Sequence, residues 1–253
     1  MTPTSALVAV TALGLVVGSF LNVVIVRVPA RRSLWKPGSA CTACGTAIAW
    51  HDNVPVVSFA LLRGRCRTCG IAIPWRYPLV EALTAILFLL AYERFGLSVA
   101  LVPALLLLAA LVAITFIDLE HQIIPDVITL PGIVTGVVAN VATGSVSWLD
   151  SVIGAIGAGA LFFAIILASG GGMGGGDMKL AAMLGAFLGW QLTLVALFLA
   201  ILGGGISVVA VSLKKKLGRK DPIPFGPFLA VGGAAALLWG QRLLTWYVDI
   251  FVS

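Results

Sequence analysis

Two aspartates of this sequence lie in segments suited to acid–base chemistry. Asp118 opens a short segment that ends at Asp126, and Asp177 follows the glycine-rich run 170–176. Two carboxylates held close together cannot both ionise readily, so such a pair shares one proton. The ionised member can take a proton from water while the protonated member polarises a peptide carbonyl. The pair therefore indicates aspartyl proteolysis, with the glycines allowing a substrate strand to approach the backbone closely.

Only ten acidic residues occur in the chain, so the rivals of this pair are few. Asp126 is the main rival of Asp118, and it is also well placed to cap a helix because it follows Pro125. Asp177 can likewise cap a helix that begins at Met178. The glycine run lacks the sequence context of a phosphate-binding loop. Capping explains each aspartate taken alone, and only the two together indicate catalysis.

The four cysteines form a second candidate site. They occur as Cys41-Thr-Ala-Cys44 and Cys66-Arg-Thr-Cys69, with 21 residues between the two pairs. This spacing is close to that in which four thiolates hold one tetrahedral Zn²⁺, and the glycine after each pair suits a tight turn. A cytoplasmic location disfavours structural disulfides. We predict structural zinc, with a reduced cluster free of metal and redox chemistry as the alternatives.

The elements that must position these sites are those of a membrane protein. The chain has 253 residues, of which 60% are hydrophobic and 10% charged, and its mean hydropathy is +1.10. A soluble domain carries about 25% charged residues, and a spanning helix needs about 20 apolar residues. Apolar runs occur at 5–26, 78–93, 98–117, 127–142, 150–169, 179–190, 192–213 and 226–247. The sequence therefore predicts an all-α polytopic membrane protein with about eight transmembrane helices.

Basic residues indicate the orientation of these helices. With the N-terminus outside and eight spans, only Arg94 and Arg242 of the 16 Lys and Arg residues fall outside or near the outer edge. The others fall on the cytoplasmic side, as the positive-inside rule requires. Because two spans separate Asp118 from Asp177, the same assignment places both at the cytoplasmic face.

One segment departs from the membrane pattern. Residues 29–77 form a small cysteine-rich cytoplasmic module between helices 1 and 2, too small to bury much of a core without a staple such as zinc. The predicted domains are the first transmembrane helix at 1–28, this four-cysteine module at 29–77 and a transmembrane aspartyl protease core at 78–253. Anionic lipid accounts for the basic residues of the module, so nucleic acid is not expected as a partner.

The sequence resembles the type IV prepilin peptidase family, which belongs with the GxGD membrane aspartyl proteases. Residues 174–177, Gly-Gly-Gly-Asp, match GxGD, and residues 118–126 resemble the companion segment that ends in Ile-Pro-Asp. Further matches follow in the order of the family, at 18–25 with Arg27 and Pro29, at 53–55, 58–59, 62–66 and 76–81, and at 224–228. The resemblance covers nearly the whole chain.

This resemblance implies cleavage of the leader peptide of type IV prepilins or pseudopilins, after a glycine, at the cytoplasmic face of the bacterial inner membrane. It also implies N-methylation of the new N-terminal residue with S-adenosyl-L-methionine. Carried over by position, Asp118 and Asp177 become the catalytic pair, supported by Asp126, Gly174, Gly176 and Lys179. The metal ligands become Cys41, Cys44, Cys66 and Cys69, and the implied partners are prepilins or pseudopilins and membrane lipid.

Three alternatives stay open at this point. The chain can be a peptidase that has lost methylation, because no segment resembles a glycine-rich methyltransferase fold. It can be a transporter that uses the carboxylates as ion sites, although it lacks paired inverted repeats and a transporter gives no reason for the cysteines. It can also be a non-catalytic membrane anchor that presents a zinc module to a partner.

Overall fold

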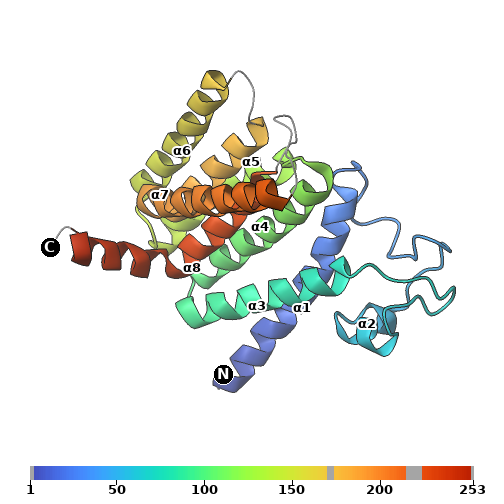
Figure 1. Cartoon of the computed structure of the whole chain (residues 1–253). Coiled ribbons are helices and arrows are strands. Elements are labelled where there is room, and N and C mark those ends of the chain that lie inside the picture. The colour runs from blue at the N-terminus through green and yellow to red at the C-terminus, as the bar shows by residue number, and fades with distance from the viewer. Residues whose placement is uncertain (1–2, 170–173, 215–223, 252–253) are drawn as a thin grey trace. The chain divides into compact units, whose positions relative to one another are not determined.

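The computed structural model describes residues 3–169, 174–214 and 224–251, and the regular secondary structure in these ranges is helical (Figure 1). The elements in chain order are α1 (Pro3–Arg27), the 3₁₀ turn η1 (Trp50–Asn53), α2 (Val57–Leu61), α3 (Arg76–Phe95), α4 (Leu101–His121), α5 (Asp126–Thr143), α6 (Trp148–Ala168), α7 (Gly175–Lys214) and α8 (Gly226–Phe251). The predicted all-α membrane architecture is confirmed. The basic residues expected at 215–220 lie outside the described residues.

Six of the described helices are long and apolar enough to cross a membrane, which is fewer than the eight predicted runs. Two differences explain the lower number. Helix α3 is not among the six because its 20 residues include four charged ones. Helix α7 covers two of the predicted runs, one on each side of a break at Gly189, and the two are counted as one helix.

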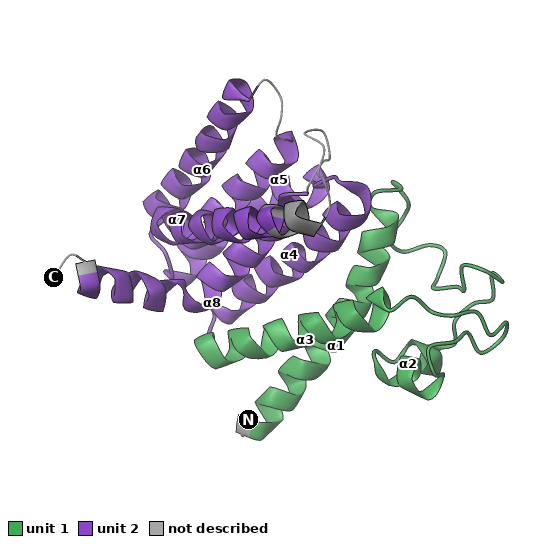
Figure 2. Cartoon of the chain, in the orientation of Figure 1, with its two compact units in different colours: residues 1–97 green, residues 98–253 purple. Residues whose placement is uncertain are grey.

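The chain divides into two compact units, Met1–Leu97 and Ser98–Ser253 (Figure 2). In the first unit α3 packs against α1, and the cysteine-rich segment connects the two helices. Their contact is close because α1 presents glycines to α3. A Cβ added at Gly14 would lie 2.6 Å from the Cα of Ala85, and one at Gly18 would lie 2.6 Å from the Cα of Glu81. Small residues at an interval of four allow such close approach of helix backbones in membranes.

The second unit is built around α7, which packs against α5, α6 and α8, while α4 packs against α5 and α8. Its core is formed by apolar side chains from these helices that are almost fully buried, including Leu107, Ile114, Leu180, Met183, Leu184 and Leu229. This core lies between α4, α7 and α8. Asp118 lies at the end of α4 and Asp177 at the start of α7, so both aspartates are on helices that contribute to the core.

Helix α7 is broken at Gly189, where φ is 72° and ψ is 170°. Its first residues lie against Ile124, just before α5, and Gly204 near its other end lies against Phe225, just before α8. Gly226 in turn contacts Asp118 at the end of α4. The two segments of α7 therefore run out and back, and both return to the same end of the unit. The two segments correspond to the two apolar runs, 179–190 and 192–213, that the sequence predicted.

The break leaves backbone carbonyls without partners inside the helix, and two polar side chains satisfy them. The Nδ2 of Asn140 donates to the carbonyls of Ala186 at 2.9 Å and Phe187 at 3.1 Å, and the hydroxyl of Ser151 also donates to Ala186. Both side chains are buried. In lipid an unsatisfied carbonyl is costly, so Asn140 and Ser151 stabilise the break at Gly189.

Candidate active site

Asp118 lies in the last turn of α4 and is buried, with 5% of its surface exposed. Its Oδ2 accepts a hydrogen bond of 3.1 Å from the backbone N–H of Gly226, the first residue of α8. The first N–H groups of a helix have no partner within the helix, and the helix dipole favours negative charge there. The start of α8 is therefore a fixed donor for the Asp118 carboxylate.

Asp177 is the third residue of α7, which begins at Gly175 and not at Met178 as the sequence suggested. Its Oδ2 faces Gly174, just before the helix, where an added Cβ would lie 3.6 Å from it, and its backbone N–H donates to the carbonyl of Gly174 at 3.2 Å. Its Oδ1 is buried and has no hydrogen-bond partner among the described residues. Capping therefore does not account for this oxygen. Asp118 and Asp177 also lie close enough for their charges to interact, so the structure brings the predicted pair together.

Two glycines allow the helix ends of the site to meet around Ile124. A Cβ added at Gly176 would lie 2.8 Å from the Cβ of Ile124, and one at Gly226 would lie 3.1 Å from its Cδ1. Gly176 therefore serves packing between α7 and the connection before α5. Gly174 is exposed, and its use for substrate approach stays a prediction. Residues 170–173 of the glycine run lie outside the described residues.

Asp126, the rival of Asp118, is engaged elsewhere. It is the first residue of α5, directly after the N-cap residue Pro125. Both carboxylate oxygens of Asp126 instead accept hydrogen bonds of 2.7 Å from the Nζ of Lys179. This pair connects the start of α5 to the first turn of α7, two residues after Asp177. Asp126 and Lys179 thus hold the two helix ends that carry the site.

The four cysteines form one cluster. Their Sγ atoms all lie within 4.8 Å of one another, and those of Cys41 and Cys69 are 3.8 Å apart. Tetrahedral zinc with Zn–S bonds of about 2.3 Å requires sulfur–sulfur distances of about 3.8 Å. The four thiols are free of disulfides. The donor set and its spacing therefore fit a tetrahedral metal ion held by Cys41, Cys44, Cys66 and Cys69.

The two cysteine pairs repeat one backbone motif. The N–H of Cys41 donates to the carbonyl of Thr46 and that of Gly45 to Cys41, each at 2.9 Å. The same two bonds recur 25 residues later, at 2.9 Å, from Cys66 to Ile71 and from Gly70 to Cys66. The glycines adopt φ of 70° and 71°, the left-handed conformation that side chains disfavour. The predicted paired knuckle turns are present.

The pKa values of three of the cysteine thiols depart from their ordinary value. Hydrogen bonds with the side chain and backbone of Thr46 lower the pKa of the Cys44 thiol to about 6. The backbone of Cys69, followed by that of Thr68, lowers the pKa of the Cys66 thiol. Although the backbone of Ile71 lowers it, burial and the neighbouring thiols raise the pKa of the Cys69 thiol to about 11. Each thiolate raises the pKa of the thiols beside it, and a bound divalent ion lowers those pKa values because it neutralises the negative charge.

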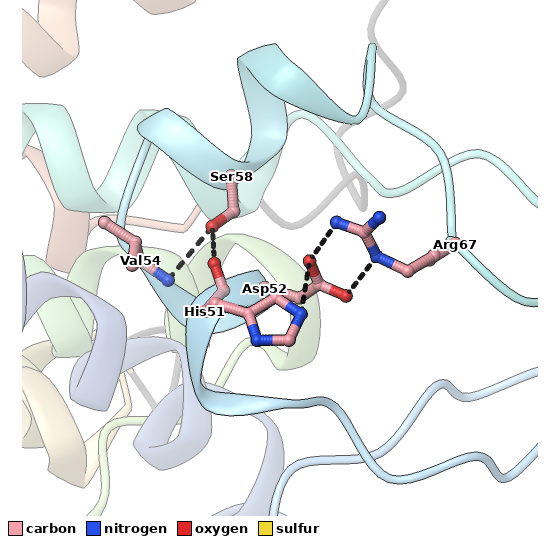
Figure 3. Close-up of polar contacts among 5 residues, drawn as sticks. All are labelled: His51, Asp52, Val54, Ser58 and Arg67. Carbon is pink, nitrogen blue, oxygen red and sulfur yellow. Dashed lines mark hydrogen bonds and ion pairs between the residues drawn. The ribbon is translucent and has the colours of Figure 1, made fainter.

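Hydrogen bonds connect the second knuckle to the segment before α2 (Figure 3). The guanidinium of Arg67 donates from Nε and a terminal nitrogen to the two oxygens of Asp52, at 2.8 and 2.6 Å, and holds the pKa of that carboxyl below its usual range. The hydroxyl of Ser58 donates to the carbonyl of His51 at 2.8 Å and accepts from the N–H of Val54 at 3.1 Å. The Arg67–Asp52 pair thus connects the second knuckle to the chain that leads into α2.

Comparison with known proteins identifies the family. Residues 12–95 match the bacterial peptidase A24 N-terminal domain, and residues 105–209 match the type IV leader peptidase family. A prepilin leader peptidase/N-methyltransferase of Aeromonas salmonicida (strain A449) is 41% identical over 266 residues, which cover 93% of this chain and 91% of the relative. The chain belongs to the type IV leader peptidase family.

Other relatives in this leader peptidase family carry the same name. That of Pseudomonas aeruginosa is 38% identical over 275 residues, covering 98% of this chain and 95% of the relative. That of Myxococcus xanthus is 44% identical over 216 residues, covering 83% of this chain and 64% of the relative. No solved structure matches the chain. Family membership and the six apolar helices make this a multi-pass inner-membrane protein.

Several residues near the leader peptidase site were not found by sequence reasoning. Gly226 is the backbone donor to Asp118, and Ile124 packs between the two glycine-containing helix starts. Gly226 does lie inside the segment 224–228 that resembles a late family motif, so a signal for it was present. Nothing in the sequence pattern showed that Lys179 pairs with Asp126.

Proposed function

We propose that this protein cleaves the leader peptide of type IV prepilins or pseudopilins with Asp118 and Asp177 as its catalytic pair. One observation carries the proposal. The two carboxylates interact electrostatically at neighbouring helix ends, one held by the N–H of Gly226 and the other with a buried oxygen that has no partner among the described residues. The names of the relatives support the substrate class.

The geometry suggests a division of roles within the pair. The Gly226 N–H favours negative charge on Asp118, so Asp118 is suited to take a proton from the attacking water. Asp177 then holds the shared proton, and its unpartnered Oδ1 is the atom that can donate to the scissile carbonyl. The water oxygen bonds to the scissile carbonyl carbon while its proton passes to Asp118 and the proton of Asp177 passes to the carbonyl oxygen, which gives the tetrahedral intermediate. The C–N bond then breaks as Asp118 returns its proton to the leaving nitrogen and Asp177 recovers one from the hydroxyl group of the intermediate. Asp126 and Lys179 keep the helix ends in place and do not take part in proton transfer.

We place this site at the cytoplasmic face, with the N-terminus outside. Two lines support the orientation: the concentration of Lys and Arg between α1 and α3, and the return of both aspartates to one end of the helical unit. A prepilin has a basic leader and a long apolar helix, so the helix can lie in the bilayer while the scissile bond meets the pair at the interface.

N-methylation of the new N-terminal residue is the second proposed activity, and the relatives' names support it. An electrophilic methyl group is required, which S-adenosyl-L-methionine supplies when bound. A peptidase without methylation, a transporter and a passive anchor each explain less, because none of them accounts for both the aspartate pair and the match to these relatives.

Zinc is proposed as a structural ion held by Cys41, Cys44, Cys66 and Cys69, for which the sulfur spacing and the lowered pKa values of Cys44 and Cys66 are the support. Bound there, the ion would join the two knuckles and stabilise the module. Membrane lipid is a further proposed partner, because Trp35 and Trp75 are 82% and 77% exposed on a basic module. The ring of Trp35 also lies 6.4 Å from that of Phe20 on the apolar helix α1, and tryptophan favours the membrane interface.

Cleavage of a purified prepilin in detergent tests the catalytic pair. We expect Asp118→Asn and Asp177→Asn each to lower the cleavage rate by at least about a hundredfold without loss of expression, since each removes one proton-transfer group. The matched control is Asp150→Asn, also in the first turn of a helix, whose Trp190 partner can still donate to the amide oxygen. Normal activity in Asp118→Asn together with lost activity in Asp126→Asn would show that the pairing is wrong.

A further inference from the structure

The first unit contains a buried carboxylate of its own. Glu81 on α3 is 8% exposed, and its Oε2 accepts a hydrogen bond of 2.7 Å from the backbone N–H of Val56. The backbone of Glu81 also packs against α1, where a Cβ added at Gly18 would lie 2.6 Å from the Cα of Glu81. Glu81 therefore connects α1 and α3 to the segment between the two cysteine pairs, which contains Val56.

The backbone that Glu81 holds is strained. Val56 has φ of 61° and ψ of −47°, and the N–H of Val57 donates to the carbonyl of Pro55 at 2.6 Å. This is a three-residue γ-turn of the rare form with positive φ, here with a β-branched residue at its centre. Strained backbone of this kind persists only where its surroundings hold it, and it concentrates at functional sites.

An acceptor without a donor lies on the neighbouring helix. Asn22 on α1 is 3% exposed, and its Nδ2 donates to the carbonyls of Tyr77 at 3.1 Å and Gly18 at 3.4 Å. These two bonds fix the amide orientation, and its Oδ1 is buried without a hydrogen-bond partner in the described ranges. Gly18 contacts the backbone of Glu81, so Asn22 and Glu81 belong to the same contact between α1 and α3. Buried polar groups are normally hydrogen-bonded, so this oxygen is available to accept from a ligand that carries an N–H or O–H group.

The chemistry of this cluster suits an amine. It offers a carboxylate and an amide oxygen, both acceptors, and the group that donates to Glu81, the backbone N–H of Val56, is neutral. An α-amine supplies up to three N–H donors and, when protonated, a positive charge. The reaction that follows leader cleavage acts on an amine of this kind. The cluster also lies in residues 12–95, outside the match to the leader peptidase model, which contains both Asp118 and Asp177.

We propose that Glu81 is the proton acceptor for N-methylation and that the Oδ1 of Asn22 positions the new α-amine beside it. This inference rests on the proposed function, because cleavage supplies the amine. The amine nitrogen forms the bond to the methyl carbon while the carbon–sulfur bond of the sulfonium donor breaks, with its electrons left on sulfur. The proton that leaves nitrogen passes to the Glu81 carboxylate and from there to water.

The hydrogen bonds of the cysteine module connect it to this cluster. Arg67, between the cysteines of the second knuckle, holds Asp52, and Ser58 at the start of α2 ties the carbonyl of His51 to the N–H of Val54. Val54 lies two residues before the strained Val56 that bonds with Glu81. The module therefore holds the turn that orients the carboxylate, which gives it a role in methylation without contact with the methyl group.

The experiment uses the full-length enzyme in detergent and measures two rates on each preparation: cleavage of prepilin, and methylation of mature pilin that has already been cleaved. Glu81→Gln keeps an acceptor for the Val56 N–H and removes the proton acceptor. We expect it to cleave normally and to methylate at least about a hundredfold more slowly near neutral pH. Asn22→Leu should also methylate slowly. The matched control is Glu93→Gln, an exposed carboxylate on the same helix, which should leave both rates unchanged.

The pH profile separates proton transfer from a structural role. A free α-amine has a pKa of about 7.7–8.0, so it loses its proton to the solvent above that range. The Glu81→Gln defect should therefore shrink as pH rises past it, whereas a structural defect stays constant. As a binding readout, wild-type protein should bind mature pilin more tightly than the same pilin acetylated at its α-amine, and Glu81→Gln should lose this preference.

Three results would overturn the inference: normal methylation by Glu81→Gln, a methylation defect that does not change with pH, or parallel loss of cleavage and methylation. Failure of the wild-type protein to cleave prepilin would instead refute the proposed function. The two failures are distinguishable because methylation is measured on mature pilin that needs no cleavage.

Discussion

The contact between Gly226 and Asp118 provides a sharp test of the active-site geometry. In Gly226→Ala the added Cβ would lie 2.6 Å from the Oδ2 of Asp118 and 3.1 Å from its Cγ. Ordinary van der Waals contact begins at 3.4 Å, so the carboxylate or the start of α8 must move by about 3.4 − 2.6 = 0.8 Å. The movement also weakens the hydrogen bond from the Gly226 N–H, which is already 3.1 Å long.

The expected effect on rate is larger than the effect on stability. A misplacement of about 1 Å at reacting groups lowers rates by about a hundredfold, and we expect a loss of this order in prepilin cleavage. Overpacking costs about 1–3 kcal/mol. The variant should therefore insert and fold while it cleaves poorly.

The assay compares initial cleavage rates in detergent with the thermal unfolding midpoint of the same preparation. Gly157→Ala on α6 is the matched control, since a Cβ there meets nothing within 4 Å, and it should cleave at the wild-type rate. If Gly226→Ala keeps both the wild-type midpoint and the wild-type rate, the held position of Asp118 is unimportant and the reasoning fails. A loss of rate that Gly157→Ala shares would also refute it.

Three further predictions follow from the contacts described. Asp126→Asn and Lys179→Met should lower the cleavage rate to similar extents, and far less than loss of either catalytic aspartate does. The double variant should cleave no more slowly than the single variants, and additive losses in a double-mutant cycle would contradict a shared ion pair. Cys44→Ser should lower the metal content measured by elemental analysis and impair methylation more than cleavage, because the cluster lies in the first unit; equal losses would mean that the module supports the whole enzyme. Asn140→Leu should lower the thermal midpoint, because each buried polar group left unsatisfied beside Gly189 costs about 1–3 kcal/mol, and an unchanged midpoint would show that the break needs no such support.

Much of this protein was readable from local sequence. Hydropathy located the apolar runs, because lipid requires long stretches of apolar residues whose backbone groups bond within the helix. Counting two runs between Asp118 and Asp177 was enough to return them to one face. The spacing of Cys41, Cys44, Cys66 and Cys69 likewise predicted their cluster, because a knuckle turn is determined by a few adjacent residues.

Tertiary structure decided what each of these residues contacts. Asp118 receives its backbone donor from Gly226, 108 residues later, and Asp126 pairs with Lys179, 53 residues later. In the sequence, Glu81 is a charged residue that makes a transmembrane helix at this position less expected. Only the tertiary structure shows that its carboxylate accepts a hydrogen bond from Val56 in a strained turn. Hydropathy and spacing are properties of neighbours along the chain, whereas these contacts depend on how glycine-containing helix faces approach one another, and no local pattern determines that approach.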